Sequence, residues 1–343
     1  MTKWVKCKLG DICTLNYGKA LTATNRVAGN VPVYSSAGVT GWHNTPLVQS
    51  KGIIVGRKGS VGTVYYSDKP FYCIDTAYYI LPDNEKYDFK WLYYRLKSLH
   101  LDKLNEDSAV PGLNRETAYA QEFLLPHLEE QRRIAGILGA IDDKIENNRR
   151  INANLELQAQ ALYKQWFVDN RCGDWKTKKL SEFFNVVTGK KDANFSTKDG
   201  AYPFFTCSQD VLKAPDYSFE GAAILLAGNG DFNVKRYIGK FEAYQRTYVL
   251  IPFDRKYHSF LYLTIKHYLQ EITGGSRGSV IKFITKGNIA DFEVALPREN
   301  IDDKLAVLDS IYQTIDSNTA ENGNLVALCD TLLPKLMNGE IKL

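Results

Sequence analysis

The sequence lacks the residue patterns that hold many small or membrane-bound proteins together. Its six cysteines contain no CxxC pair and its five histidines no HxxxH pair, so the spacing supports neither a structural zinc site nor a disulfide scaffold. It also has no apolar N-terminal run and no stretch of 18 apolar residues. We therefore expect a soluble, cytoplasmic protein with no membrane partner and no bound metal.

Motifs for catalysis are missing as well. The sequence contains no GxxxxGK[ST], no GxGxxG between a strand and a helix, and no HExxH. Amino-group methyltransferases carry Asn or Asp before two prolines and an aromatic residue, and no Pro-Pro pair occurs here. The carboxylate pairs Asp142-Asp143 and Asp302-Asp303 fall on expected helices without a basic ligand cluster, which favours a solvated face. We predict no catalytic residue and no cofactor in this chain.

Charge and length set wide bounds. The 43 basic and 39 acidic residues give a net charge of +4, which is compatible with nucleic-acid binding but does not argue for it. A chain of 343 residues is long enough for two domains with separate cores.

Residues 128–167 form the most regular stretch and predict one long helix of roughly 60 Å. Apolar residues and two asparagines recur at steps of three and four, which is the spacing of a helix–helix seam. The predicted seam positions are Leu138, Ile141, Ile145, Asn148, Asn152, Leu155 and Leu162.

The same pattern returns 170 residues later, over residues 300–337. Both asparagines recur, and a buried Asn in a seam fixes the register at a cost in stability. The alternative is two ordinary amphipathic helices in separate cores. The corresponding seam positions are Leu308, Ile311, Ile315, Asn318, Asn322, Leu325 and Leu332.

The whole chain repeats with a period of about 171 residues. Trp4, Gly18, Lys19 and Gly59 align with Trp175, Gly189, Lys190 and Gly230. A repeat this long indicates a duplicated domain rather than a solenoid. We expect two similar α/β units at 1–127 and 171–298, each followed by a long helix at 128–170 and 299–343.

Local patterns predict the elements inside these units. We expect strands at 31–35, 52–55, 63–66, 71–81, 123–125, 224–226, within 241–252 and at 292–296. We expect helices at 9–13, 88–104, 180–184 and 259–272. In the second long helix, Asn300 is the expected cap, Gly323 an interruption, Pro334 a kink and Gly339 the stop.

Paired glycine-rich turns are the main candidates for binding. In the first unit, Arg57, Lys58 and Ser60 lie among Gly56, Gly59 and Gly62; small residues allow close approach to a surface, and the basic pair can reach phosphates or guanine edges. The equivalent turn of the second unit carries amide and carboxylate side chains that suit adenine and cytosine. Two turns that recognise different base sequences need different side chains, as found here. The alternative is that both are hairpin turns with ordinary surface charge and no role in binding. The second set is Asn229, Asp231, Asn233 and Lys235.

Other candidates are weaker. Lys19 and Lys190 occupy equivalent places and suggest a shared phosphate contact. For the remaining loop residues a solvated surface position is the competing interpretation. These residues are Arg26, Arg115, Arg246, Arg277 and Lys282.

The motifs together resemble a known family over the whole chain. Leu125-Pro126, followed by residues 128–135 (LEEQRRIA), matches the entry to a conserved helix of type I restriction-modification specificity subunits, with His127 where a second proline is usual. The turns at 57–62 and 230–233 and the ending LLPKLMNGEI at 332–341 also resemble that family.

The resemblance implies an α+β fold with two target recognition domains, held apart by conserved helices that pack as an antiparallel coiled coil with pseudo-twofold symmetry. It implies recognition of a bipartite double-stranded DNA target, one half per domain. The length of the helices separately allows the two units to reach major grooves about one turn (~34 Å) apart. The resemblance implies partners too: two modification subunits that bind S-adenosylmethionine and methylate adenine, and restriction subunits that use ATP and Mg²⁺. The second helix begins with a degenerate copy of the first, which suggests different docking contacts. A coiled-coil adaptor without a DNA role and a single-chain DNA-modifying enzyme remain the alternatives.

Overall fold

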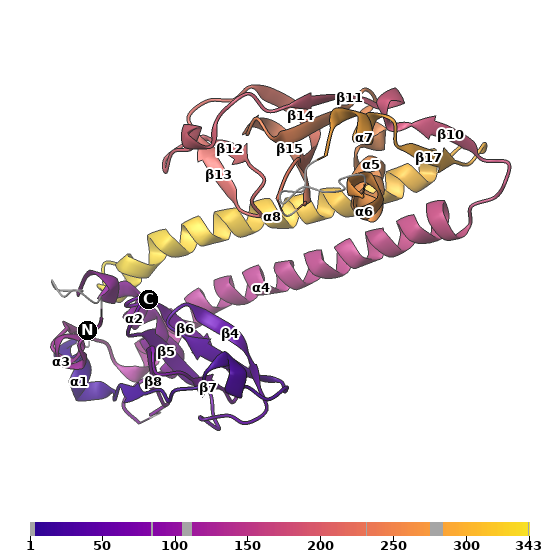
Figure 1. Cartoon of the computed structure of the whole chain (residues 1–343). Coiled ribbons are helices and arrows are strands. Elements are labelled where there is room, and N and C mark those ends of the chain that lie inside the picture. Colours follow the sequence, from indigo (N-terminus) through magenta and orange to yellow (C-terminus); the bar gives the residue numbers. More distant parts are fainter. Residues whose placement is uncertain (1–3, 84, 105–111, 231, 275–283, 342) are drawn as a thin grey trace. The chain divides into compact units, whose positions relative to one another are not determined.

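The chain folds into two compact units in a computed structural model that describes residues 4–83, 85–104, 112–230, 232–274, 284–341 and 343. Unit 1 comprises Met1–Asn147 and Glu321–Leu343, and unit 2 comprises Asn148–Ala320. Both long helices are therefore divided between the units (Figure 1). The boundaries expected at residues 127, 170 and 298 separate the recognition domains from the long helices and do not divide the chain into compact units. They stay a prediction.

Unit 1 is built on small sheets backed by helix α2. The sheet orders are β1-β9, β2-β8-β5-β6 and β4-β3-β7. Helix α2 begins where Asp88 Oδ1 accepts a hydrogen bond from Trp91 N at 2.9 Å. The elements are β1 (Val5–Lys8), α1 (Leu9–Ile12), β2 (Asn16–Tyr17), β3 (Val31–Ser35), β4 (Gly38–His43), β5 (Gly52–Gly56), β6 (Val64–Ser67), β7 (Tyr72–Cys73), β8 (Ala77–Ile80), α2 (Phe89–Ser98), α3 (Arg115–Tyr119) and β9 (Glu122–Leu125).

Unit 2 follows the same plan with longer strands. Its sheets have the orders β10-β17 and β11-β16-β14-β15-β12-β13. Helix α5 lies between the large sheet and α8 (Figure 1). The elements are β10 (Lys176–Lys179), β11 (Phe184–Thr188), β12 (Tyr202–Phe205), β13 (Val211–Ala214), β14 (Phe219–Ala227), β15 (Val234–Ala243), β16 (Thr247–Pro252), α5 (His258–His267), α6 (Leu269–Thr273), α7 (Lys286–Ala290) and β17 (Glu293–Leu296).

The predicted duplication is confirmed by the strand pairing. Val5 pairs with Leu125 in unit 1, and Lys176 pairs with Leu296 in unit 2, each pair displaced by 171 residues. Both units also contain one parallel pair at equivalent places, β3 with β7 and β12 with β15. Shared hydrogen-bond registers mean that the two units are copies of one fold and not merely similar in composition.

The two long helices are α4 (Leu128–Lys164), which continues into a π-helical turn at Gln165–Asp169, and α8 (Asp302–Met337). They pack antiparallel in each unit, as expected. In unit 1, Lys144 Nζ lies 3.0 Å from Glu321 Oε2, and Arg133 Nη1 donates to Leu343 O at 3.3 Å. Residue numbers therefore rise along one helix as they fall along the other.

The seam predicted from the sequence differs in depth along the helices. In unit 1 Ile134, Leu138, Ile141 and Ile145 are buried in the main core. In unit 2 most seam residues are only half-buried. The seam positions of unit 2 that the structure leaves half-buried are Asn152, Leu155, Leu162, Ile311, Ile315 and Asn318, whereas Asn148 and Leu308 are buried. In unit 1 the seam positions of the second long helix, Asn322, Leu325 and Leu332, are half-buried as well.

A second face of α4 packs on unit 2 and was not predicted. Ala159, Tyr163 and Phe167 are buried there, and the ring centroid of Phe167 lies 4.9 Å from that of Phe260 on α5. This face explains why the seam pattern skips a heptad near residue 158, because the helix turns those positions toward a domain core. Each long helix is thus both a seam element and a core element.

Several element predictions were wrong in detail. The strand expected at 71–81 is two strands, because Ala77 N donates to Ile74 O at 3.1 Å and closes a turn that moves the chain from one sheet to another. The helix expected at 88–104 ends at Ser98, with His100 at φ 49° and a 3₁₀ helix from Leu101 to Leu104.

In the second unit, the helix expected at 180–184 is a 3₁₀ turn, Leu180–Glu182, followed at once by β11. Gly323 does not interrupt α8, which runs through it. Pro334 also lies inside α8, and the kink expected there stays a prediction. Asn300 Oδ1 does accept from Asp302 N at 2.8 Å, and Gly339, at φ 72°, lies just after the end of α8, as predicted. No helix in the described part of the chain is long and apolar enough to cross a membrane.

Candidate nucleic-acid interface

The glycine-rich turn of unit 1 is a tight and exposed connection between β5 and β6. Gly59 and Gly62 have φ values of 76° and 73°, which residues other than glycine adopt only with backbone strain. Two backbone hydrogen bonds hold the start of the turn, because Arg57 N and Lys58 N both donate to Thr76 O, at 2.9 and 3.0 Å. Lys58 and Ser60 are exposed on it.

The side chain of Arg57 is held in one orientation. Its Nε and Nη2 donate to the backbone carbonyl of Asp75 at 3.1 and 2.7 Å. Its Cζ lies 5.3 Å from the ring centroid of Tyr17 and 5.9 Å from that of Tyr78. A guanidinium stacked on tyrosine rings and bonded along one edge keeps its other edge for a ligand.

A cleft of about 580 Å³ opens beside this arginine. Tyr17, Arg57, Lys58 and Arg115 line it, together with Glu116. Arg115 has its Cζ 5.4 Å from the ring centroid of Tyr17, and its contact with Glu116 is a long surface pair of 3.7 Å. Among the described lining residues three cations face one carboxylate, so this lining favours an anionic or acceptor-rich ligand.

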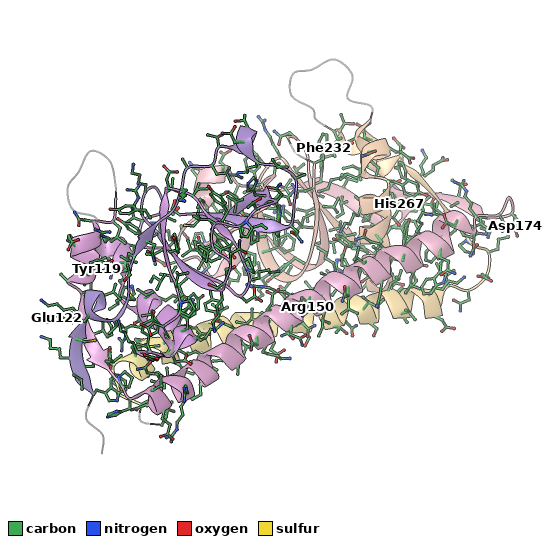
Figure 2. All side chains as sticks on the ribbon, turned by 90° about the horizontal axis from the view of Figure 1, so that it is seen from below. Tyr119, Glu122, Arg150, Asp174, Phe232 and His267 are labelled. Carbon is green, nitrogen blue, oxygen red and sulfur yellow. The ribbon has the colours of Figure 1, made fainter. Side chains whose placement is uncertain are left out.

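Two tyrosine hydroxyls bond to the backbone in unit 1, one of them at the cleft. Tyr78 donates to Leu113 O at 3.1 Å, and burial, followed by the hydrogen bond with Tyr17, raises the pKa of Tyr78 to about 12. The Tyr119 hydroxyl accepts from Leu15 N at 2.9 Å; Tyr119 is the last residue of α3 and is labelled in Figure 2. Tyr78 is therefore positioned as a neutral donor in the framework rather than as an acid.

Unit 2 has the equivalent turn with different side chains. Gly230 has φ 72°, matching Gly59, and Ile284 N donates to Gly228 O just as Leu113 N donates to Arg57 O. Gly228 thus occupies the place of Arg57. Asn229, at the place of Lys58, is half-buried.

Two candidates of unit 2 take part in the loop framework. Asn233 is buried, and its Nδ2 donates to Cys207 O at 2.8 Å. Lys235 Nζ donates to Asn233 Oδ1 and to Ser208 O, each at 2.5 Å, and burial lowers the pKa of Lys235. A base contact by either residue would require these bonds to open first.

The remaining candidates divide by exposure. Lys19 and Lys190 are exposed at equivalent positions, with Lys190 Nζ 5.5 Å from the ring centroid of Phe219. Arg246 is also exposed. The Arg26 side chain is hydrogen-bonded within the protein, because its Nη1 donates to Thr40 O at 2.7 Å. Asp231, Arg277 and Lys282 lie outside the described residues.

Sequence reasoning missed the aromatic partners of this site. Tyr17 directly precedes the repeated Gly18-Lys19 pair, which was a usable signal, but its stacking on Arg57 depends on the pairing of β2 with β8. That pairing joins residues about 60 positions apart, and no local pattern marks it.

No group of three or more His, Cys, Asp or Glu side chains able to hold a metal occurs among the described residues. The letters of residues 274–278 fit the GxSxG pattern of hydrolases, but this segment follows helix α6 directly. The pattern needs a strand before the serine turn, so it gives no support for a nucleophile here.

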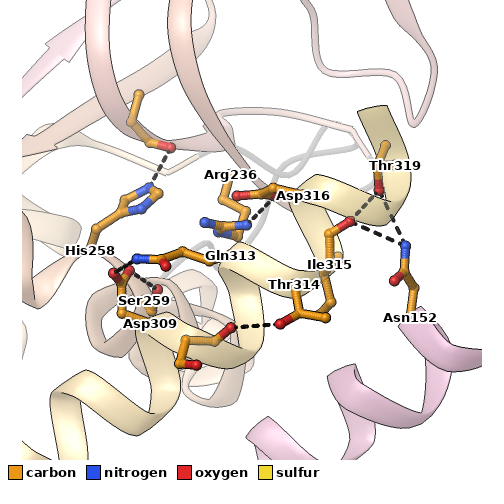
Figure 3. A network of polar contacts seen from close by, with 12 residues as sticks. Asn152, Arg236, His258, Ser259, Asp309, Gln313, Thr314, Ile315, Asp316 and Thr319 are labelled. Carbon is orange, nitrogen blue, oxygen red and sulfur yellow. Dashed lines mark hydrogen bonds and ion pairs between the residues drawn. The ribbon is translucent and has the colours of Figure 1, made fainter. Parts of the chain in front are cut away.

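A second polar network joins the sheet of unit 2 to α8 (Figure 3). Arg236 Nη1 lies 2.6 Å from Asp316 Oδ1 and its Cζ 4.5 Å from the ring centroid of Tyr312. Ser259 Oγ donates to Asp309 Oδ1 at 3.0 Å. These contacts hold the sheet of unit 2 against α8. The same sheet carries the glycine turn of unit 2.

Comparison with known proteins agrees with this architecture. The model of the type I restriction modification DNA specificity domain matches residues 1–157 and 173–325, so it matches twice. The chain belongs to this family of specificity subunits. The two matched segments coincide with the two copies of the repeat.

Individual relatives support the assignment. The chain is 42% identical over 173 residues to the type I restriction enzyme EcoDI specificity subunit of Escherichia coli, a match that covers 49% of this chain and 39% of that protein. It is 24% identical over 304 residues to the MjaIX specificity subunit of Methanocaldococcus jannaschii, covering 74% and 69%. The crystal structure of a type I restriction-modification S subunit from M. genitalium has the same fold, with a TM-score of 0.68 at 20% identity and coverage of 97% and 96%.

Proposed function

We propose that this chain is the DNA specificity subunit of a type I restriction-modification complex and that each recognition domain binds one half of a bipartite target. One observation carries the proposal: two copies of one fold present the same glycine turn, with Arg57 and Lys58 in one copy and Gly228 and Asn229 in the other. A conserved frame with exchanged side chains suits two half-sites of different sequence.

Binding energy and sequence choice come from different residues in this scheme. The exposed lysines Lys19, Lys58 and Lys190 suit phosphate contacts, which supply most of the affinity and make it dependent on salt. A few side chains in each turn choose the bases.

The partners and cofactors expected from the family belong to the same proposal. Two modification subunits would bind S-adenosylmethionine and methylate adenine, and restriction subunits would use ATP and Mg²⁺. The specificity chain itself would catalyse nothing, bind no cofactor and act in the cytoplasm. Lys256 Nζ lies 3.0 Å from Asp302 Oδ1 at the entry of α8, so this entry would offer a modification subunit contacts different from those at the entry of α4.

The test uses the chain assembled with its modification subunits. Replacing Arg57 and Lys58 together by Ala should degrade recognition of one half-site, measured by methylation of targets with a base change in either half. Asn229→Ala is the matched control and should affect the other half. Equal damage to both halves would contradict the division of labour.

Two further measurements separate the alternatives. Methyl transfer or Mg²⁺-dependent cleavage by the isolated chain would favour a single-chain enzyme. An assembled complex without DNA affinity, even at low salt, would favour a coiled-coil adaptor.

A further inference from the structure

The two recognition domains differ in one specific arrangement, a stacked arginine. In unit 1, Arg57 lies against Tyr17 in the cleft. At the equivalent places of unit 2 the chain has Gly228 and Thr188. A role for this arginine in base recognition rests on the proposed function and adds a specific residue to it.

The hydrogen bonds of Arg57 determine which of its donors remain. A guanidinium has five N–H groups, two on each Nη and one on Nε. Asp75 O takes the Nε and one Nη2 hydrogen and is the only hydrogen-bond acceptor of the Arg57 side chain among the described residues. The edge formed by Nη1 and the second Nη2 hydrogen is left to donate two parallel bonds.

Two parallel N–H donors of this kind, a donor fork, fit two acceptors that lie in one plane. In the major groove the O6 and N7 atoms of guanine form that pair, and bidentate arginine is their commonest specific partner. A phosphate also offers two acceptors, but it is present at every nucleotide and does not require the plane of the guanidinium to be fixed. Here the plane is fixed twice, by the Asp75 carbonyl and by the Tyr17 ring.

The duplication separates base readers from phosphate contacts. A phosphate contact serves any sequence, so the same residue can make it in both copies, as Lys19 and Lys190 do. A base reader should differ between the copies, because the two half-sites differ. Arg57 is replaced by a glycine in unit 2, while the backbone around it is retained.

We propose that Arg57 reads a guanine in the half-site of unit 1, with Tyr17 as the positioning residue that holds its plane. Lys58 and Arg115 neutralise the neighbouring phosphates. Unit 2 lacks this reader and so recognises no guanine through the same position of its turn.

The experiment measures methylation by the assembled complex on targets in which each base pair of both half-sites is changed in turn. The wild-type complex should require guanine at one position of the half-site of unit 1. Arg57→Lys keeps the charge but loses the fork, and it should lower that preference by about 5- to 150-fold, the factor for 1–3 kcal/mol. Other positions should change by less than about twofold.

Control variants separate reading from packing and from charge. Tyr17→Ala should lower the guanine preference, and Tyr17→Phe should restore it because a stacking ring remains. Lys58→Gln should weaken all targets alike and reduce the slope of log affinity against log salt by about 0.9. Thermal unfolding of each complex checks the fold, and Arg57→Gln provides a second fork-deficient variant.

An Arg57→Lys complex that weakens every target equally would show a phosphate contact and overturn the assignment. So would a wild-type complex that requires no guanine in that half-site. A wild-type complex without any sequence preference would instead overturn the proposed function itself.

Discussion

The amide pair between the long helices offers a quantitative test of how the seam is specified. Asn318 Nδ2 donates to Asn152 Oδ1 at 2.8 Å in unit 2. Asn152 Nδ2 in turn lies 3.3 Å from both Ile315 O and Thr319 Oγ1 (Figure 3). Each amide therefore depends on the other helix, and a change to one leaves its partner facing an apolar group.

The expected magnitudes follow from this geometry. Asn318→Leu removes one hydrogen bond, worth roughly 0.5–1.5 kcal/mol, and leaves Asn152 Oδ1 without that donor. Both side chains are half-buried, which lets water partly compensate, so we expect a net loss of about 1 kcal/mol. The double change to Leu removes both polar groups and should recover that loss or exceed it. The coupling energy should be about 1–2 kcal/mol in favour of the double variant.

Urea unfolding of the wild type, both single variants and the double variant measures this cycle. Distant, independent sites add to within about 0.3–0.5 kcal/mol. Single losses that simply add in the double variant would refute the idea that the amides pair across the seam. A double variant less stable than either single variant would show that the asparagines act through other contacts.

Three further predictions concern charge and hydrogen bonding. Burial lowers the pKa of His258 to about 4 from 6.5, so the unfolded state alone takes up a proton below pH 6.5; the folded state should lose up to about 3 kcal/mol between pH 6.5 and 4, and denaturation of His258→Gln over that range should show a flatter dependence. Tyr94 donates to Asp142 Oδ2 at 2.6 Å, so Tyr94→Phe should cost about 1 kcal/mol of unfolding free energy, and an unchanged urea midpoint would contradict it. Lys19→Gln and Lys190→Gln should each reduce the salt slope of DNA binding by about 0.9 without changing base preference, as a salt titration on matched and mismatched targets would show.

Helical periodicity and the repeat were predictable because both are local or self-similar signals. The spacing of Leu138, Ile141 and Ile145 marks a buried stripe, and these residues are buried. The alignment of Gly59 with Gly230 located turns with nearly equal φ values. Recurrent glycines reveal a backbone requirement that the surrounding side chains do not alter.

Contacts across the fold were not predictable in the same way. Arg95 is buried, and its Nη2 donates to the carbonyls of Leu124 and Met337, where burial lowers its pKa to about 10. In the sequence it is one of several basic residues on an amphipathic helix. Only the closure of unit 1 around the end of α8 distinguishes it from a surface arginine.

The duplication itself explains why the shared backbone framework was easier to predict than the side chains proposed to recognise bases. Tyr78 and Tyr248 both donate to a backbone carbonyl beside their turns, Leu113 O and Ile284 O, so the same framework is present in both copies. A side chain that must distinguish one half-site from the other cannot recur, and a repeat alignment therefore hides it. Positions where the backbone bonds coincide but the side chains do not, such as Arg57, are where half-site preference should be encoded.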